Sequence, residues 1–270
     1  MTRIGMGYRR PLHDWIIANP DSLECLEITA EHFFASDHSV LRSLRERFPL
    51  YVHGLGLSLG TPGALDAATM NQFKEVADSA NAVHVSEHVA FTRSAETDLG
   101  HLNPLPRTED SLQTFIEHAR ELASVTGRRV LLENITTHLD TGGEMSEPEF
   151  LNRLSAESGC ALLLDITNLF INSRNHGFNA EDWLTELDDN TVAQLHIVGY
   201  ECRNGVYNDS HAQPIQDDLL ELTQQALRRF QVESIILERD QRFEETTEIE
   251  ADLRKLRALT QPAAQSHDRI

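Results

Sequence analysis

Short apolar runs alternate with amphipathic segments along most of the chain. Eight runs are continuously apolar, as expected of parallel strands that are buried on both faces. These predicted strands cover residues 3–7, 23–29, 50–56, 82–89, 129–135, 161–168, 192–198 and 234–240. Apolar residues at helical spacing lie between the strands. The predicted helices cover residues 12–18, 37–48, 64–79, 109–126, 146–157, 180–187, 214–230 and 246–258.

Capping residues support several of these boundaries. Asp37, the sequence SEPEF at 146–150 and Pro214 each precede an apolar periodic segment, as helix starts do. Gly127 and Gly159 follow two of the segments and are expected to end those helices.

Repetition of a strand followed by a helix predicts the fold class. About eight such units within residues 1–260 are what a single (β/α)8 TIM barrel of the α/β class requires. The alternative is an open doubly wound sheet, but the glycine motif that binds phosphate in such sheets does not follow the first strand. No linker divides the chain, so we expect one domain over residues 1–260 and a disordered tail over 261–270.

Composition narrows the class of protein. The formal net charge of −20 argues against binding to a phosphate backbone, which requires positive charge. No run approaches the roughly 20 apolar residues of a membrane span, and the N-terminus lacks the apolar segment of a signal peptide. We therefore expect a cytoplasmic protein without nucleic-acid or membrane partners. Its three cysteines, Cys25, Cys160 and Cys202, have no paired spacing and are expected to be reduced.

Polar and ionisable residues recur at or near the carboxyl ends of the predicted strands. They are Glu27, His53, His88, Glu133, Asp165 with Asn168, His196, and Glu238 with Asp240. Asp209 and His211 follow the seventh strand in what we expect to be a loop. In a barrel these strand ends meet at one face, where the βα loops build the active site. The sequence therefore predicts that these side chains converge.

Converging imidazoles and carboxylates indicate a metal site, because buried charges of this kind cannot stay unpaired. Such donors suit iron, zinc or manganese better than calcium or magnesium. More than six candidate ligands exceed the needs of one octahedral ion, so two or three bridged ions are favoured.

Each strand-end residue also has a structural explanation as a cap or a hydrogen-bond acceptor, and other histidines need no site. Glu27 is expected to orient a ligand, His84 to be a satisfied core residue, and His101 is a candidate for the entrance. Five other histidines are expected to be solvated: His32, His38, His118, His138 and His267.

Several motifs together resemble the multinuclear non-heme iron-dependent oxidase family, across nearly the whole chain. They are GMGYR, LEITAEHFF, VHGLGLSLG, VSEHVAF, NPLPRT, LLENITTHL, LLLDITNLFIN, NHGF, LHIVGY, DSHAQP and LERD. The family fold is a (β/α)8 barrel. LERD resembles the methanobactin-forming branch, which makes oxazolone and thioamide groups, whereas HGLGLSLG and NPLPRT resemble a more general branch.

The resemblance implies two or three irons of mixed Fe(II)/Fe(III) valence that use dioxygen as a co-substrate. The substrate would be a residue, most often cysteine, of a ribosomally synthesised precursor peptide. A separate leader-binding protein would form a heterodimer with this chain. Asp240 would lie beside the bound thiol as a base. The implied metal ligands are His53, His88, Glu133, Asp165, Asn168, His196, Asp209, His211 and Glu238.

Two other functions remain open at the level of the sequence. A metal-dependent isomerase or hydrolase barrel uses similar donors, although a zinc-dependent endonuclease is disfavoured by the negative charge. A non-catalytic protein that stores or delivers metal is the second alternative, and its site should be coordinatively closed.

Overall fold

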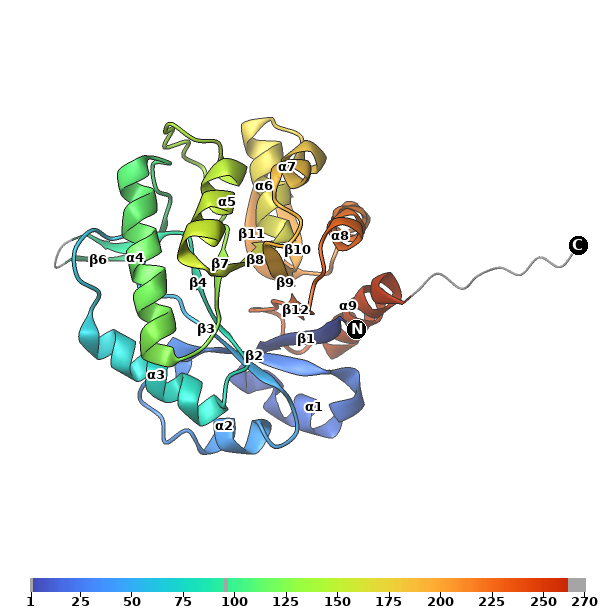
Figure 1. The fold of residues 1–270 in the computed structure, drawn as a ribbon. Coiled ribbons are helices and arrows are strands. Elements are labelled where there is room, and N and C mark those ends of the chain that lie inside the picture. The colour runs from blue at the N-terminus through green and yellow to red at the C-terminus, as the bar shows by residue number, and fades with distance from the viewer. Residues whose placement is uncertain (1, 95–96, 262–270) are drawn as a thin grey trace, which may run out of the picture.

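Eight parallel strands close into a barrel that is surrounded by helices (Figure 1). The computed structural model describes residues 2–94 and 97–261, so residues 262–270 of the predicted tail lie outside the described residues. Around the barrel the strands follow the order β1-β2-β3-β4-β7-β8-β9-β12. They are β1 (Arg3–Tyr8), β2 (Cys25–Thr29), β3 (Leu50–His53), β4 (Val85–His88), β7 (Val130–Glu133), β8 (Ala161–Asp165), β9 (Val192–Ile197) and β12 (Ser234–Leu237). The predicted fold class is confirmed.

Helices follow the strands around the outside of the barrel. The α-helices are α1 (His13–Ala18), α2 (Ser39–Leu44), α3 (Ala67–Ala80), α4 (Glu109–Thr126), α5 (Glu147–Ser158), α6 (Ile166–His176), α7 (Ala180–Glu186), α8 (Asp217–Arg229) and α9 (Thr246–Thr260). Three short 3-10 helices are η1 (Arg10–Leu12), η2 (Pro20–Ser22) and η3 (Ala30–Phe33). Ser146 caps α5 by accepting a hydrogen bond from Glu149 N, and Gly127 and Gly159 end α4 and α5 in the left-handed conformation, as predicted.

Several predicted boundaries are wrong. The strands predicted over 50–56, 161–168 and 234–240 end earlier than their apolar runs, at His53, Asp165 and Leu237. Helix α6 was not predicted, because it begins directly at the residue after β8 without an intervening loop. Helix α8 begins at Asp217 rather than at Pro214.

Two β-hairpins extend from the carboxyl-terminal side of the barrel and were not predicted. The first pairs β5 (Phe91–Ser94) with β6 (Thr97–Asn103), and the second pairs β10 (Gly199–Arg203) with β11 (Val206–Gln213). The turn of the second hairpin is Asn204–Gly205, with φ angles of 54° and 81°, as the Asn-Gly hairpin signal requires. Asp209 and His211 therefore lie on a strand and not in a loop.

The interior of the barrel changes character along its axis. Cys25, Tyr51 and Ile236 form a small apolar cluster within it. The His84 ring stacks on Tyr51 with centroids 4.1 Å apart, and its Nε2 lies 2.7 Å from Gln194 Oε1. Gln194 in turn donates to Glu27. A polar column thus rises through the barrel toward the strand ends, and His84 is a satisfied core residue, as predicted.

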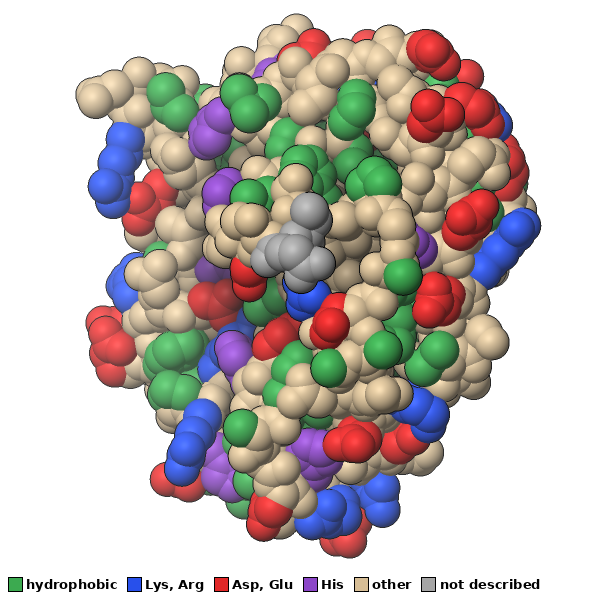
Figure 2. All heavy atoms as spheres, turned by 90° about the vertical axis from the view of Figure 1, so that its left-hand side faces the viewer, with side chains coloured by type: hydrophobic (Ala, Val, Ile, Leu, Met, Phe, Trp, Pro, Cys, Tyr) green, Lys and Arg blue, Asp and Glu red, His purple; other side chains and the backbone are tan. Residues whose placement is uncertain are grey.

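The outer surface is mixed in charge on the face shown in Figure 2. Acidic and basic side chains are interspersed there, and histidines are visible at several points. Among the described residues, no helix combines the length and apolar character needed to cross a bilayer.

Candidate metal centre

The carboxyl ends of the strands bring the predicted donors together. His88 and Glu133 are register partners of β4 and β7, and Asp165 and His196 are register partners of β8 and β9. Because side chains that are level on neighbouring strands lie next to one another, each pair projects from the barrel at one height. Three groups of donor atoms result, each with its atoms within 4.8 Å of one another.

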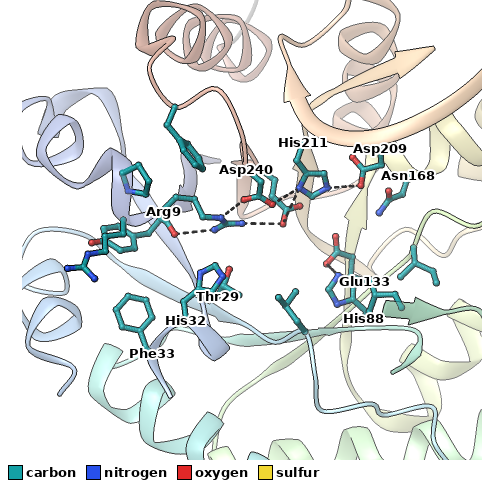
Figure 3. A pocket seen from close by; sticks show the side chains of 18 of the residues that line it. Arg9, Thr29, His32, Phe33, His88, Glu133, Asn168, Asp209, His211 and Asp240 are labelled. Atoms are coloured by element: carbon teal, nitrogen blue, oxygen red, sulfur yellow. Dashed lines mark hydrogen bonds and ion pairs between the residues drawn. The ribbon is translucent and has the colours of Figure 1, made fainter. Parts of the chain in front are cut away.

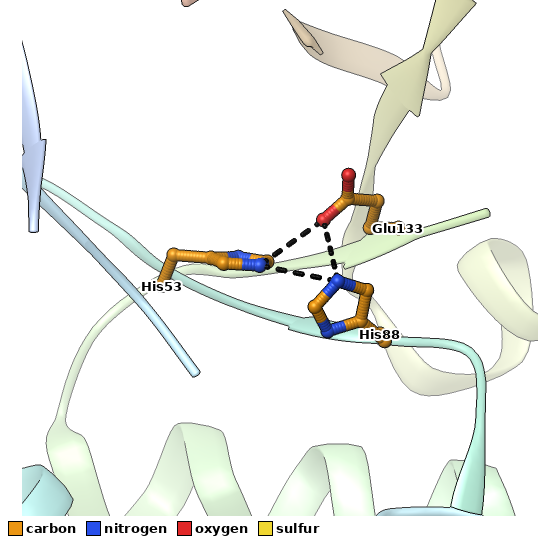
Figure 4. Close-up of side chains that lie close together, drawn as sticks. All are labelled: His53, His88 and Glu133. Atoms are coloured by element: carbon orange, nitrogen blue, oxygen red, sulfur yellow. Dashed lines mark hydrogen bonds and ion pairs between the residues drawn. The ribbon is translucent and has the colours of Figure 1, made fainter. Parts of the chain in front are cut away.

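The first group consists of His53, His88 and Glu133 (Figure 4). Both imidazoles aim Nε2 at the same carboxylate oxygen, Glu133 Oε2, at 3.2 Å for His53 and 3.4 Å for His88. The two Nε2 atoms are 3.4 Å apart. All three side chains are buried. Two nitrogens and one oxygen therefore point at a single place.

The second group consists of Glu133, Asp165, His196 and Glu238, all of them buried. His196 Nδ1 lies 3.0 Å from Glu133 Oε1 and 3.1 Å from Glu238 Oε2. The opposite ring nitrogen, Nε2, lies 2.8 Å from Glu27 Oε1. Glu27 thus orients His196 from behind, as an outer carboxylate orients a metal-ligating imidazole.

The third group consists of His211, Glu238 and Asp240. His211 Nδ1 is 2.9 Å from Asp240 Oδ2 and 3.9 Å from Glu238 Oε1. On its other side, His211 Nε2 is 2.6 Å from Asp209 Oδ2. Arg9 contacts this group through an ion pair with Asp240, and its Nη2 lies 3.7 Å from Glu238 Oε1 (Figure 3).

Two carboxylates connect the three groups. Glu133 belongs to the first and second groups, and Glu238 belongs to the second and third. A carboxylate with one oxygen facing each of two donor groups is the arrangement that bridges neighbouring ions. The geometry therefore suits a row of ions better than separate mononuclear sites.

Two predicted ligands lie beside these groups. Asn168 is in the first turn of α6, where its backbone N–H donates to Asp165 Oδ1 at 2.7 Å, so Asp165 also caps that helix. The Asn168 amide oxygen accepts a hydrogen bond from Thr136, and its side chain lines the cavity described below. Asp209 contacts His211 and keeps its Oδ1 buried without a hydrogen-bond partner among the described residues.

Outer partners hold the imidazoles of the first group. His53 Nδ1 lies 2.8 Å from Ser86 Oγ, and His88 Nδ1 lies 3.1 Å from Glu87 Oε1. With Nδ1 hydrogen-bonded, each ring directs Nε2 toward Glu133. Glu87 was not predicted, because it lies between two inward-facing residues of β4, Ser86 and His88, and strand alternation places its side chain on the other face.

Charge in the centre is balanced by protons when no cation lies between the carboxylates. Burial and the neighbouring Glu133 and Asp209 raise the pKa of Asp165 well above its ordinary value. Burial alone would lower the pKa of His88, but Glu133 and Glu87 outweigh it and raise the pKa to about 9. For His53, burial outweighs the attraction of Glu133 and lowers the pKa. The lowered pKa keeps the His53 ring neutral, and a metal-binding imidazole must be neutral.

An orphaned oxygen shows that the residues fit a cation. Glu133 Oε2 is fully enclosed and has no partner of hydrogen-bond geometry among the described residues, although two imidazole nitrogens face it. Burying an ionised oxygen without a partner is costly. A metal ion between the three atoms would satisfy all of them, and it would replace the protons that otherwise neutralise the cluster.

A cavity of about 1090 Å³ opens above the donors (Figure 3). His88, Glu133, Asn168, Asp209, His211, Glu238 and Asp240 line one part of it. The rest extends over β1, η1 and η3, with walls from Tyr8, Arg9, Phe33 and the exposed His32. Its size exceeds that of an ordinary small-molecule site. These walls were not predicted, although the GMGYR motif passes through them.

The histidines outside the groups follow the predictions in part. His32 is exposed, as predicted, whereas His38 is half-buried, with Nδ1 2.8 Å from Ser79 Oγ and Nε2 3.0 Å from the Phe33 carbonyl oxygen. His101 and His138 are exposed, and only His138 of these two lines the cavity. The prediction that His118 is solvated is wrong, because His118 is buried and its ring nitrogens contact the carbonyl oxygens of Leu59 and Gly63. His267 lies outside the described residues.

Comparisons with known proteins agree with this centre. The family described as RiPP precursor modification enzyme MbnB/TglH/ChrH matches residues 3–261. The chain belongs to this family. Two relatives of this chain are described as UPF0276 proteins. That of Acaryochloris marina is 33% identical over 229 residues, 84% of this chain and 83% of the relative. That of Chromobacterium violaceum is 30% identical over 258 residues, 94% of each chain.

Solved structures resemble this MbnB/TglH/ChrH member in fold alone. A D-psicose 3-epimerase in the presence of D-fructose superposes with a TM-score of 0.65 at 11% identity, covering 95% of this chain and 97% of the epimerase. Endonuclease IV from Thermus thermophilus superposes with a TM-score of 0.60 at 17% identity, covering 95% of this chain and 99% of the endonuclease. The family match identifies an enzyme that modifies precursor peptides, which removes the non-catalytic alternative.

Proposed function

We propose that this enzyme is a multinuclear non-heme iron oxidase that uses dioxygen to oxidise a cysteine of a ribosomally synthesised precursor peptide. The observation that carries the proposal is the row of three donor groups joined through Glu133 and Glu238. Imidazole and carboxylate donors suit iron, and the groups contain no thiolate that dioxygen would oxidise. Two or three irons of mixed Fe(II)/Fe(III) valence would be held by the donors of these groups other than Asp240, together with the adjacent Asp209 and Asn168.

The iron would supply sites that bind the cysteine thiolate and dioxygen, and it would relay electrons from the cysteine, which is oxidised, to dioxygen, which is reduced. The chain's own contribution begins with the cavity, which is large enough for several peptide residues and ends at the donors. Glu27 and Ser86 orient His196 and His53. The buried walls around these donors exclude bulk water from the first and second groups.

Asp240 is proposed as the base beside the thiol. Burial raises its pKa, but His211 and Arg9 outweigh burial and lower the pKa below its ordinary value. A carboxylate with a lowered pKa accepts a proton only from an acidic donor. The thiol must therefore be made acidic by binding to the ion, which is the usual way a thiolate forms at a metal. The leader of the peptide would be held by a partner protein in a heterodimer.

Iron content tests the proposal directly. The protein would be loaded with iron and purified without oxygen, then measured for iron per chain and by Mössbauer spectroscopy, beside His211→Ala and the exposed control His101→Ala. We expect two or three irons with coupled ferric and ferrous signals, about one iron fewer in His211→Ala, and no change in His101→Ala. A single zinc that His211→Ala leaves in place would return the isomerase or hydrolase alternative.

Oxygen uptake tests the substrate. Cysteine-bearing peptides encoded by short reading frames beside the gene would be added to the iron-loaded protein, each with its Cys→Ser counterpart. We expect uptake with a cysteine peptide and none with its serine form. Uptake that is equal for both forms would refute cysteine as the target.

A further inference from the structure

Arg239 lies between two donors in sequence but faces away from them. Glu238 and Asp240 flank it at the end of β12 and point into the cavity. Because side chains of extended chain alternate, Arg239 points outward, between the barrel and α9. It is fully buried, at 0% exposure. An arginine in such a place needs partners.

The Arg239 guanidinium joins two segments that are distant in sequence. Its Nη1 donates to the carbonyl oxygen of Ala212 at the end of β11, at 2.8 Å. Its Nη2 lies 3.2 Å from Asp252 Oδ2 on α9. Asp252 is also 0% exposed, and both of its oxygens accept from Ile215 N at 3.2 Å. One ion pair thus ties together β11, β12 and α9.

The residues of the third donor group are direct chain neighbours of the residues that this ion pair holds. His211 directly precedes Ala212, and its carbonyl oxygen accepts a hydrogen bond from Asp240 N at 2.9 Å. His211 has a φ of 49°, a left-handed conformation that is strained for a residue with a side chain. Such a conformation persists only where the surrounding contacts impose it.

We propose that the Arg239–Asp252 pair is a positioning device for the third donor group, which sets the distance between His211 on β11 and the two carboxylates that follow β12, Glu238 and Asp240. The inference rests on the proposed function, since it concerns the retention of one ion of the row. Fold stability alone does not account for the pair, because a buried ion pair can be replaced by apolar residues with little loss of stability. The planar guanidinium provides what an apolar pair lacks, two fixed directions for hydrogen bonds.

The double variant Arg239→Met/Asp252→Leu separates positioning from folding. It removes both buried charges at once, so neither is left without the other. Lys255, 3.0 Å from Asp252 Oδ1, and Glu248, 3.5 Å from Arg239 Nη1, also lose a partner, but both are partly exposed and can be solvated. The control is Arg254→Ala/Glu250→Ala, an ion pair of 3.6 Å on the outer face of the same helix, whose side chains are 65% and 36% exposed. Each protein would be measured for thermal unfolding without metal, iron per chain and Mössbauer spectrum.

We expect the double variant to unfold close to the wild-type temperature and to retain about one iron fewer, with the spectrum of His211→Ala. Adding His211→Ala to it should remove no further iron, because both changes act on one group. If the double variant does not fold, Arg239→Lys serves in its place. Lysine keeps the positive charge but lacks the planar guanidinium with its fixed hydrogen-bond directions. We expect the Arg239→Lys protein to lose the same iron.

Wild-type iron content and an unchanged spectrum in either folded variant would overturn the positioning role. That result differs from failure of the proposed function, which would be seen as the absence of multiple irons in the wild-type protein and would overturn both.

Discussion

Asp165→Asn tests whether the carboxylates of the centre are mutually repulsive without metal. Asp165 shares the second donor group with Glu133 and Glu238, with ligand atoms within 4.8 Å of one another. The substitution replaces a buried ionisable group by a neutral one of the same shape. It also keeps the α6 cap, because asparagine accepts the hydrogen bond from Asn168 N as aspartate does. Any change in stability therefore reports the charge.

The magnitude follows from the spacing. At an effective dielectric constant of about 20, two like charges 4.8 Å apart repel by about 3.5 kcal/mol. Partial protonation of Asp165 and attraction to His196 relieve part of this repulsion in the wild type. We therefore expect Asp165→Asn to raise the free energy of unfolding of the metal-free protein by about 1–3 kcal/mol at pH 7.5. Iron retention should fall at the same time, because a charged ligand is lost.

The effect should depend on pH with a defined sign. The folded-state pKa of Asp165 is raised, so the folded protein holds a proton that the unfolded chain loses above about pH 4. Wild-type stability from this group therefore falls as pH rises toward the folded-state pKa. The advantage of Asp165→Asn should accordingly be smaller at pH 5.0 than at pH 7.5.

Urea unfolding of chelator-treated protein, followed by circular dichroism, measures the effect. The exposed control Asp21→Asn should differ from the wild type by less than about 0.5 kcal/mol. The reasoning would be refuted if Asp165→Asn destabilised the metal-free protein at pH 7.5, or if its effect were the same at both pH values.

Two further predictions concern the hairpin and the polar column. In Gly199→Ala, a Cβ would overlap the carbonyl oxygens of Pro214 and Gln213, so we expect loss of about one iron and faster proteolysis of β10–β11. The control is Val206→Ala, which shortens an exposed side chain of the same hairpin. Full iron in Gly199→Ala would contradict the argument. Burial lowers the pKa of His84 to about 4, from 6.5. The stability that depends on a neutral His84 is therefore lost as pH falls below about 6.5, by about 2 kcal/mol at pH 5.0. Urea unfolding should show that His84→Gln loses less unfolding free energy at pH 5.0 than the wild type does. An equal loss in both proteins would show that His84 is not the cause.

The barrel could be predicted from sequence because its signals are local. Each parallel strand is an apolar run, and the donors of the first two groups stand at or next to the end of such a run. The start of α6 could not be found in this way, since Asp165 is at once the last residue of β8 and the cap of the helix. The apolar pattern continues across that boundary, so no change of period marks it.

Parts of the site depend on tertiary contacts that no local pattern records. Glu87 reaches His88 by accepting from both its backbone and its ring. His118 is held by a loop 55 to 59 residues earlier in the chain. The Asn204–Gly205 turn is an exception, since a two-residue hairpin signal was present in the sequence and the segment was nevertheless expected to be a loop.

The β10–β11 hairpin has a consequence for how this enzyme family can diversify. It leaves the barrel after β9 and returns before α8, so its length and tip do not affect the register of any barrel strand. Both of its donors, Asp209 and His211, are on the returning strand near the base and not at the turn. Insertions, deletions and exchanges at the tip, which does not line the cavity, can therefore accumulate during evolution without displacing the two donors on the returning strand.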